Sequence, residues 1–168
     1  RAGFRRSYGI VYAPICPSCR ACLAVRTVVG EFKPSTSQKR VIRINKDIVV
    51  NKRPALATHE QYALFVKYQE SRHAGGDMAK MDYYDYQALI EETPVNTFIL
   101  EYRDFDRLVG ACIVDEMADG LSAVYSFFDP TNKRKSLGTQ IIMALFDLAL
   151  QYGLPYVYLG YWVSGSQK

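Results

Sequence analysis

Residues 119–152, DGLSAVYSFFDPTNKRKSLGTQIIMALFDLALQY, predict a strand, a loop and a helix in that order. Gly120 marks a hairpin turn, because glycine accepts the positive φ that such turns need. The stretch 121–128 is rich in β-branched and aromatic residues, which favours a strand. Pro130 ends this strand, since proline has no N–H to donate to a ladder. Apolar residues then recur at helical spacing over 137–152.

The loop between this strand and this helix is basic. Lys133, Arg134 and Lys135 lead into Ser136, which is a candidate N-cap for the helix. The free amide N–H groups at a helix start attract anions, and the preceding cations strengthen that attraction. The loop therefore predicts a binding site for a phosphate or a carboxylate.

The chain has 168 residues, enough for one domain or for one domain with a small attachment. Hydrophobic residues make up 49% of it, which is enough to build a core. No window holds the roughly 18 consecutive apolar residues of a membrane span, and no secretory signal is recognisable. We therefore expect no membrane partner.

Positive charge is concentrated in the first third of the chain. Residues 1–53 hold 12 Lys and Arg against 2 Asp and Glu, a net charge of +10. Residues 54–168 carry a net charge of −6. We therefore divide the chain into a basic N-terminal region, 1–53, and a larger domain, 54–168. The basic region predicts contact with a polyanion, and a merely solvated basic face is the alternative.

Three of the four cysteines lie close together, as Cys16, Cys19 and Cys22. Thiolates at this spacing can turn onto one soft metal, so a zinc or iron–sulfur site is one interpretation. The alternative is three reduced thiols in a tight loop, because structural zinc takes four ligands and no histidine lies nearby in the sequence. A secreted disulfide framework would spread its cysteines, which favours a cytoplasmic location.

The segment 35–46, STSQKRVIRINK, predicts a capped helix with a cationic face. Its basic residues recur at spacings of three or four, which places much of their charge on one side. Such a face suits sequence-independent contacts with a phosphate backbone, and ordinary solubility is the alternative. The residues concerned are Lys39, Arg40, Arg43 and Lys46.

The remaining segments complete an α+β order of elements. One helix is predicted from a capping box at Thr58 to about His73, and another from Asp82 to Glu91. The expected strands are 8–12, 23–32, 97–103, 107–115, 121–128 and 155–163, with 50–57 as a linker.

This order of elements resembles the acyltransferase fold of the N-acetyltransferase (GNAT) superfamily. The resemblance implies a mixed, mostly antiparallel sheet with flanking helices. It also implies that the strand before the main helix splays from the next strand, and that the acyl donor sits in the gap. The loop 134–139 carries only part of the glycine-rich pattern by which GNAT acetyltransferases hold coenzyme A.

Six segments carry a more specific resemblance. They are GFRRS (3–7), CPSCRAC (16–22), DGLSAVY (119–125), FDP (128–130), RKSLG (134–138) and LPYVYLGYW (154–162). Together they are similar, over nearly the whole chain, to the arginyl-tRNA–protein transferase family in its bacterial aspartate/glutamate leucyltransferase form.

The family resemblance implies an aminoacyltransferase. Its members move an amino acid from aminoacyl-tRNA to the N-terminus of a protein, which marks that protein for degradation as an N-degron. The bacterial form implies leucyl-tRNA as the donor and proteins with N-terminal Asp or Glu as acceptors, and the sequence leaves arginine open as the donor. No cofactor is required by this reaction. The basic face of helix 35–46 becomes the expected tRNA contact.

Site residues follow from what the reaction needs. Aminolysis of an activated ester depends on positioning and a stabilised carbonyl more than on a strong base. We expect Asp129 or Asp115 to orient or deprotonate the incoming ammonium, and Asp129 and Tyr125 are the candidate catalytic residues. Cations for the acceptor carboxylate and walls for the leucyl group are expected from Arg72, His73, Ser122, Phe128, Arg134, Lys135, Ser136, Leu137, Gly138, Tyr158 and Tyr161.

Two other functions stay open. A coenzyme A-dependent acetyltransferase of the same fold would explain the partial glycine pattern, but it gives the basic region 1–53 no role. A non-catalytic RNA-binding module with a metal knuckle would explain that region, but it leaves the aromatic strands unexplained. Binding of aminoacyl-tRNA against acetyl-coenzyme A, and transfer to an Asp-starting peptide, would separate the three.

Overall fold

A six-stranded sheet organises the computed structural model, which describes residues 3–165. The strand order is β3-β8-β7-β6-β5-β4, and every neighbouring pair is antiparallel except β7 and β8. The sheet is therefore mixed and mostly antiparallel, as predicted. Its strands are β3 (Cys22–Val28), β4 (Ile48–Pro54), β5 (Asn96–Asp104), β6 (Arg107–Met117), β7 (Gly120–Phe128) and β8 (Tyr156–Val163).

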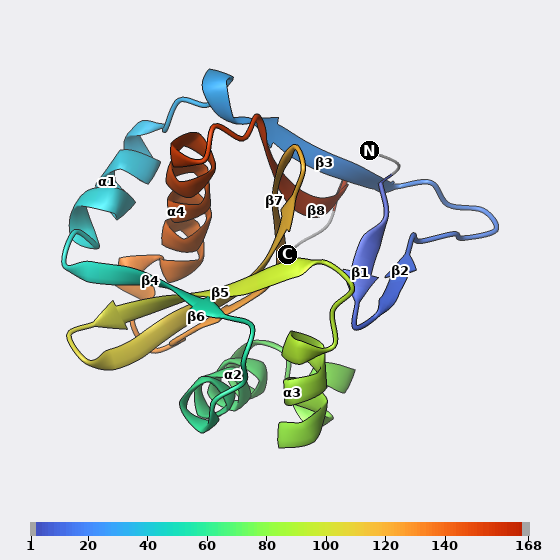
Figure 1. Ribbon diagram of the computed structural model, residues 1–168, viewed down its shortest axis with the longest axis horizontal. Helices are drawn as coiled ribbons and strands as arrows, with labels where there is room; N and C mark the ends of the chain where they lie inside the picture. Colours follow the sequence, from blue (N-terminus) through green and yellow to red (C-terminus); the bar gives the residue numbers. More distant parts are fainter. Residues whose placement is uncertain (1–2, 166–168) are drawn as a thin grey trace.

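Helices cover both faces of this sheet (Figure 1). One face carries α1 (Thr36–Ile44) and α4 (Leu137–Gln151), and the other carries α2 (His59–Arg72) and α3 (Tyr83–Glu91). A short hairpin of β1 (Arg5–Ser7) and β2 (Ile10–Tyr12) lies beside the second face, where Tyr8 joins the apolar cluster of α2 and α3. None of the described helices is both long and apolar enough to cross a membrane.

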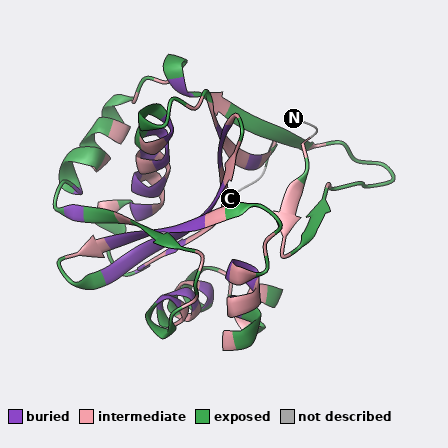
Figure 2. Cartoon of the chain, in the orientation of Figure 1, coloured by how far each residue is buried: buried purple, intermediate pink, exposed green. Residues whose placement is uncertain are grey.

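The middle of the sheet is buried because it has helices on both sides (Figure 2). Every residue of β6 from Leu108 to Asp115 is buried. On the α2 side, Phe65 and Tyr86 pack their rings against Phe127 of β7, at centroid distances of 5.5 and 6.0 Å. Each such side chain contributes about 1.5–3 kcal/mol on burial. The edge strand β3, by contrast, is mostly exposed and can line a site.

The strands β7 and β8 pair only where they begin. Their parallel register covers Gly120–Ser122 and Tyr156–Tyr158, and beyond these residues the two strands no longer pair. A β-bulge also interrupts the pairing of β7 with β6, with Val124 as the extra residue. A bulge leaves a residue outside the ladder and bends its strand. The splay predicted from the fold resemblance is therefore confirmed.

Gly120 is needed for space rather than for a special φ. Its φ is not positive, so the reason given for the turn at this position was wrong. A Cβ on Gly120 would lie 2.4 Å from the carbonyl oxygen of Tyr156, across the β7–β8 pair. Glycine thus permits the close approach of the two strands at their paired end.

The predicted helix starts are confirmed by their caps. In each case the N-cap side chain accepts a hydrogen bond from the backbone N–H three residues later. The side chain of that later residue accepts a hydrogen bond from the backbone N–H of the N-cap residue. These reciprocal caps fix where the helices begin, independently of the sheet. The pairs are Ser35 with Gln38, Thr58 with Gln61, and Asp82 with Asp85.

Two predictions about the N-terminal part were wrong. The expected linker 50–57 is largely the edge strand β4, which pairs with β5 along its whole length. Its charged residues and its final Pro54 are typical of an edge strand. The boundary placed after residue 53 therefore falls inside β4. Of the expected strand 8–12, residues 10–12 do form a strand, β2, but its first part was wrong, because Tyr8 has a φ of 52° and lies in the turn between β1 and β2.

Candidate active site

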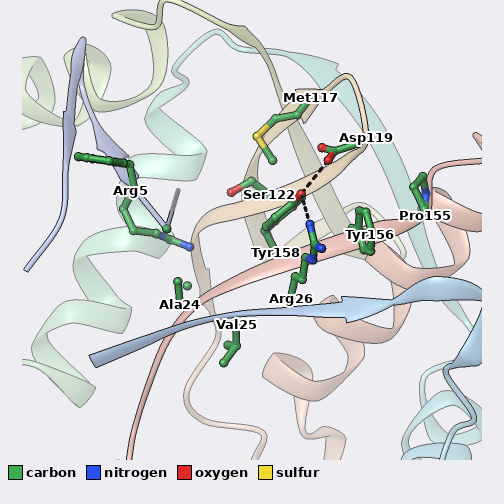
Figure 3. A pocket seen from close by; sticks show the side chains of 13 residues that line it. Arg5, Ala24, Val25, Arg26, Met117, Asp119, Ser122, Pro155, Tyr156 and Tyr158 are labelled. Atoms are coloured by element: carbon green, nitrogen blue, oxygen red, sulfur yellow. Dashed lines mark hydrogen bonds between the residues drawn. The ribbon is translucent and has the colours of Figure 1, made fainter. Parts of the chain in front are cut away.

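A pocket of about 760 Å³ lies against β3, β7 and β8, beside the paired start of the two splayed strands (Figure 3). Its wall combines charged and apolar groups. The charged ones are Arg5, Arg26 and Asp119, and Phe4 and Met117 are among the apolar ones. A pocket of this mixed character suits a substrate with both charged and apolar parts.

Arg5 reaches into this pocket from β1 and fastens the hairpin to β7. Its Nη2 donates hydrogen bonds to the carbonyl oxygens of Ala123 (3.0 Å) and Val124 (2.9 Å), at the bulge. Its Nη1 is buried and has no hydrogen-bond partner among residues 3–165. The guanidinium passes over Gly160, where a Cβ would lie 2.8 Å from Nη1. Because a buried charged donor without a partner is costly, Nη1 is a candidate for substrate contact.

Arg26 of β3 lies on another wall of the pocket. Its Cζ is 3.8 Å from the centroid of the Tyr156 ring, so the cation stacks on the aromatic face. Its Nη1 donates a hydrogen bond to the hydroxyl of Tyr158 (3.3 Å), which in turn donates to Oδ2 of Asp119 (3.1 Å), as Figure 3 shows. The structure thus brings the predicted Tyr158 together with two charged residues that we did not predict.

Tyr125 of β7 is held by α2. Gln69 Nε2 donates a hydrogen bond to the Tyr125 hydroxyl at 2.7 Å, while Gln69 Oε1 is buried without a partner among the described residues. Burial raises the pKa of Tyr125, and the hydrogen bond from Gln69 only partly offsets this. The phenol therefore keeps its proton at neutral pH and can donate a hydrogen bond rather than act as a base. Its catalytic role stays a prediction.

Asp129 is buried and surrounded by donors. It accepts hydrogen bonds from Lys67 Nζ (2.9 Å), Thr131 N (3.0 Å) and Thr131 Oγ1 (2.7 Å), and Arg107 lies 3.6 Å away. Burial would raise the pKa of Asp129, but the hydrogen bonds from Thr131 and Lys67 lower it to about 2. The carboxylate is therefore ionised, and its oxygens already accept hydrogen bonds from Lys67 and Thr131. This arrangement suits a structural role, in which Asp129 joins the end of β7 to α2, better than a role as a general base.

Asp115, the other candidate for the ammonium, is also occupied. Arg6 donates two hydrogen bonds to its carboxylate, each 2.9 Å long, and Thr97 donates a third at 2.7 Å. Both partners of this ion pair are nearly buried. Such a bidentate pair fixes the hairpin on the sheet and leaves little of Asp115 for a substrate.

Part of the basic loop after β7 makes contacts within the protein. Lys135 donates to Asp104, the last residue of β5, and the carbonyl oxygen of Lys135 accepts a hydrogen bond from Asn45 Nδ2 at 2.7 Å. Arg134 is exposed. Ser136 stands at the N-cap of α4, but its side chain makes no capping hydrogen bond and its φ is 47°. Ser136 therefore occupies the predicted N-cap position, but it does not cap the helix through its side chain.

Phe128 marks a second place where predicted residues meet. A Cβ on Gly138, in the first turn of α4, would lie 3.0 Å from the Phe128 ring. The same ring lies 5.0 Å from that of Tyr68, which lies 5.7 Å from the His73 ring. The end of α2 and the start of α4 therefore meet at Phe128, where the strands β7 and β8 no longer pair.

The other predicted substrate contacts fall in different surroundings. Ser122 lines the pocket. The Tyr161 hydroxyl donates to the carbonyl oxygen of Gly3, another pocket residue. Leu137 is buried in the core, so it cannot contact a substrate directly. Arg72 is exposed at the end of α2.

The basic residues of the predicted tRNA contact lie on and just after α1. Lys39, Arg40 and Arg43 border a shallow surface pocket, and Lys46 is exposed after the helix. The exposure of all four leaves them free to meet a phosphate backbone. tRNA binding by this face stays a prediction.

The three clustered cysteines do not form a metal site in the structure. The backbones of Cys16 and Cys19 pair in an isolated antiparallel β-bridge, and Cys22 begins β3. All three cysteines are exposed, and none forms a disulfide. Within residues 3–165, no group of three or more His, Cys, Asp or Glu is placed to hold a metal ion. Three exposed thiols alone do not complete the four-ligand set of structural zinc, so a zinc or iron–sulfur site at these cysteines stays a prediction, and we assign no chemistry to a metal.

Comparison with known proteins places this chain among the transferases. The family model "Arginine-tRNA-protein transferase, C terminus" matches residues 60–168, and the corresponding N-terminus model matches residues 1–40. The aspartate/glutamate leucyltransferase of Paramagnetospirillum magneticum is 52% identical, and the match covers 100% of this chain and 69% of that protein. The one of Gluconacetobacter diazotrophicus is 53% identical, with coverage of 100% and 65%. The chain thus spans about two thirds of the length of these relatives.

Solved structures share the fold without detectable sequence similarity. The C-terminal domain of a lysylphosphatidylglycerol synthetase from Agrobacterium fabrum matches with a TM-score of 0.64 and 6% identity, over 83% of this chain and 46% of that one. L-PGS from Bacillus licheniformis matches with a TM-score of 0.62 and 10% identity, over 86% and 46%. The GNAT-like acyltransferase fold is therefore confirmed. With both family models and full-length relatives in agreement, the chain belongs to the arginine-tRNA-protein transferase family.

Proposed function

We propose that this protein transfers leucine from leucyl-tRNA to the N-terminal amine of proteins that begin with Asp or Glu. The observation that carries the proposal is identity of about half of all residues, across the whole chain, to proteins named aspartate/glutamate leucyltransferase. We place the reaction in the cytoplasm, where the exposed free cysteines stay reduced. The leucine added would mark the acceptor for degradation.

On the donor side, the tRNA backbone lies along the basic face of α1, and the aminoacyl end enters beside the splayed part of β7. The ester carbonyl is then close to the bulge at Val124. Arg5 is fixed there by two backbone carbonyl groups, and its buried Nη1 has a hydrogen left to donate. A fixed donor aimed at the oxygen where charge develops is the most effective aid to acyl transfer.

The chemical step needs little else from the protein. The acceptor amine attacks the ester carbon, a C–N bond forms, and the C–O bond to the ribose breaks. The proton that the amine gives up leaves with the ribose oxygen, so charge and atoms balance. An N-terminal amine has a pKa of about 7.7–8.0, so a useful fraction is neutral near pH 7. Arg5 would stabilise the negative oxygen of the tetrahedral intermediate.

The test is transfer from labelled aminoacyl-tRNA to peptides that start with Asp. Leucyl-tRNA and arginyl-tRNA are supplied side by side, and acetyl-coenzyme A in a third reaction. We expect a leucylated peptide from the first reaction only. Transfer of arginine would identify arginyl-tRNA as the donor. Acetylation of the peptide would identify a coenzyme A-dependent acetyltransferase. Binding of tRNA without any transfer would indicate a non-catalytic RNA-binding module.

A further inference from the structure

We infer that the pocket between β3, β7 and β8 is the acceptor subsite, and that Arg26 recognises the side-chain carboxylate of the N-terminal Asp or Glu. This inference rests on the proposed function and assigns a residue to its specificity. The sequence instead predicts the loop residues Arg134 and Lys135 among the cations that bind this carboxylate.

The first argument is that Arg26 is exposed and forms no salt bridge with a carboxylate within residues 3–165, so a ligand can reach its guanidinium. Its side chain donates a hydrogen bond to the hydroxyl of Tyr158. Most other cations around the sheet are paired with the protein's own carboxylates. The pairs are Arg6–Asp115, Lys52–Glu116, Lys67–Asp129, Arg103–Glu60 and Lys135–Asp104.

The second argument is preorganisation. The guanidinium lies over the Tyr156 ring, with its Cζ 3.8 Å from the ring centroid, and its Nη1 donates a hydrogen bond to the Tyr158 hydroxyl. The remaining N–H groups form a planar fork, which matches the two oxygens of a carboxylate. A side chain already held in place loses less entropy when it binds, so the contact is worth more.

The third argument is the arrangement of charge in the pocket. The first residue of an acceptor presents a carboxylate and an amine only a few bonds apart. The pocket presents Arg26 and Asp119 on either side of the Tyr158 hydroxyl, which contacts both (Figure 3). The carboxylate on Arg26 would leave the amine on the side of Asp119. Arg5, which lines the same pocket, is the donor proposed for the ester carbonyl.

The test compares kcat/KM for peptides that start with Asp, Glu and Asn, with leucyl-tRNA saturating. Arg26→Ala should lower kcat/KM about ten- to a hundred-fold for the Asp and Glu peptides, mainly through KM, because a charge-assisted contact is lost. The Asn peptide should keep its wild-type value. Arg26→Lys should recover only part of the loss, since it keeps the charge without the fork. Arg53→Ala, at the opposite edge of the sheet, is the matched control and should change nothing.

The outcomes separate the two claims. Failure of the wild type to transfer any amino acid from leucyl- or arginyl-tRNA overturns the proposed function and this inference with it. Normal wild-type transfer with an unchanged Asp-to-Asn ratio in Arg26→Ala overturns the inference alone. An equal loss of kcat/KM on all three peptides in Arg26→Ala also overturns the inference alone. If Arg26→Ala melts early, Arg26→Gln gives the same test, because Gln can still donate to Tyr158.

Discussion

The loop after β7 and the pocket between β3, β7 and β8 both carry positive charge, but they use it differently. In the loop, Lys135 is bound to Asp104, and at the end of β7 Asp129 is held by Lys67. In the pocket, Arg26 forms no salt bridge with a described carboxylate, and Arg5 has an unpartnered buried nitrogen. Lys135, from a cluster of cations in the sequence, thus fixes the loop, whereas Arg5 and Arg26, from strands distant in the sequence, line the pocket that we propose for the acceptor.

The largest effect should come from Arg5. Arg5→Ala should lower kcat about a hundred- to a thousand-fold, because that is the typical loss when one donor to the developing oxyanion is removed. The loss should be equal for Asp and Asn peptides, because the ester is common to both. Single-turnover transfer at saturating substrate measures it. Added guanidinium should restore part of the activity of Arg5→Ala. Loss of melting temperature without rescue would mean that Arg5 only supports the bulge.

Asp129→Asn should act on stability instead. Removing the charge that binds Lys67 and Thr131 should cost about 1.5–3 kcal/mol in the free energy of unfolding. Because the pKa of Asp129 is lowered to about 2 in the fold, its contribution is present above the unfolded value of about 3.9 and is lost as pH falls toward 2. Urea unfolding from pH 5 to pH 2 should therefore show a flatter pH dependence in the variant. An identical pH dependence, with a rate loss on every peptide, would restore Asp129 as a catalytic residue.

The double variant Lys39→Ala/Arg43→Ala tests the donor side. It should weaken tRNA binding by roughly 1–3 kcal/mol and reduce the salt dependence of that binding, because two phosphate contacts are lost. The Asp-to-Asn preference of the remaining activity should not change. Titration of tRNA at several salt concentrations gives both numbers, and an unchanged salt slope would exclude this face.

The smallest effect should come from Lys135→Ala. Its partly exposed ion pair with Asp104 should contribute about 1 kcal/mol or less to stability. The preference for Asp over Asn should survive both in this variant and in Arg134→Ala. If either variant loses the preference while Arg26→Ala keeps it, the loop reads the acceptor after all.

Local sequence signals sufficed for much of the fold. The capping residues Ser35, Thr58 and Asp82 predicted three helix starts, because a cap depends only on residues three apart. The strand β4 was missed, since an exposed edge strand that carries charge and ends in proline has the composition of a linker. The splay of β7 from β8 came from the fold resemblance and from no local pattern.

The site was harder to predict because its contacts are distant in the sequence. Arg5 bonds to Ala123 and Val124, and Arg26 bonds to Tyr158, so no local window contains both partners. The segment GFRRS was noticed, but its side chains had no assigned partner. Conversely, the neighbours of Asp129 in the sequence gave no sign that Lys67 of α2 would occupy it.

The central claim is that an acidic N-terminus binds at Arg26, and side-chain NMR tests it most directly. Arginine Nε–H signals of the uniformly labelled protein, assigned by single Arg→Lys substitutions, are followed during titration with a peptide that starts with Asp. We predict that the Arg26 signal shifts with saturation while that of Arg134 stays in place, and that a peptide starting with Asn leaves both unchanged. A saturating shift of Arg134, with Arg26 unmoved, would contradict the account.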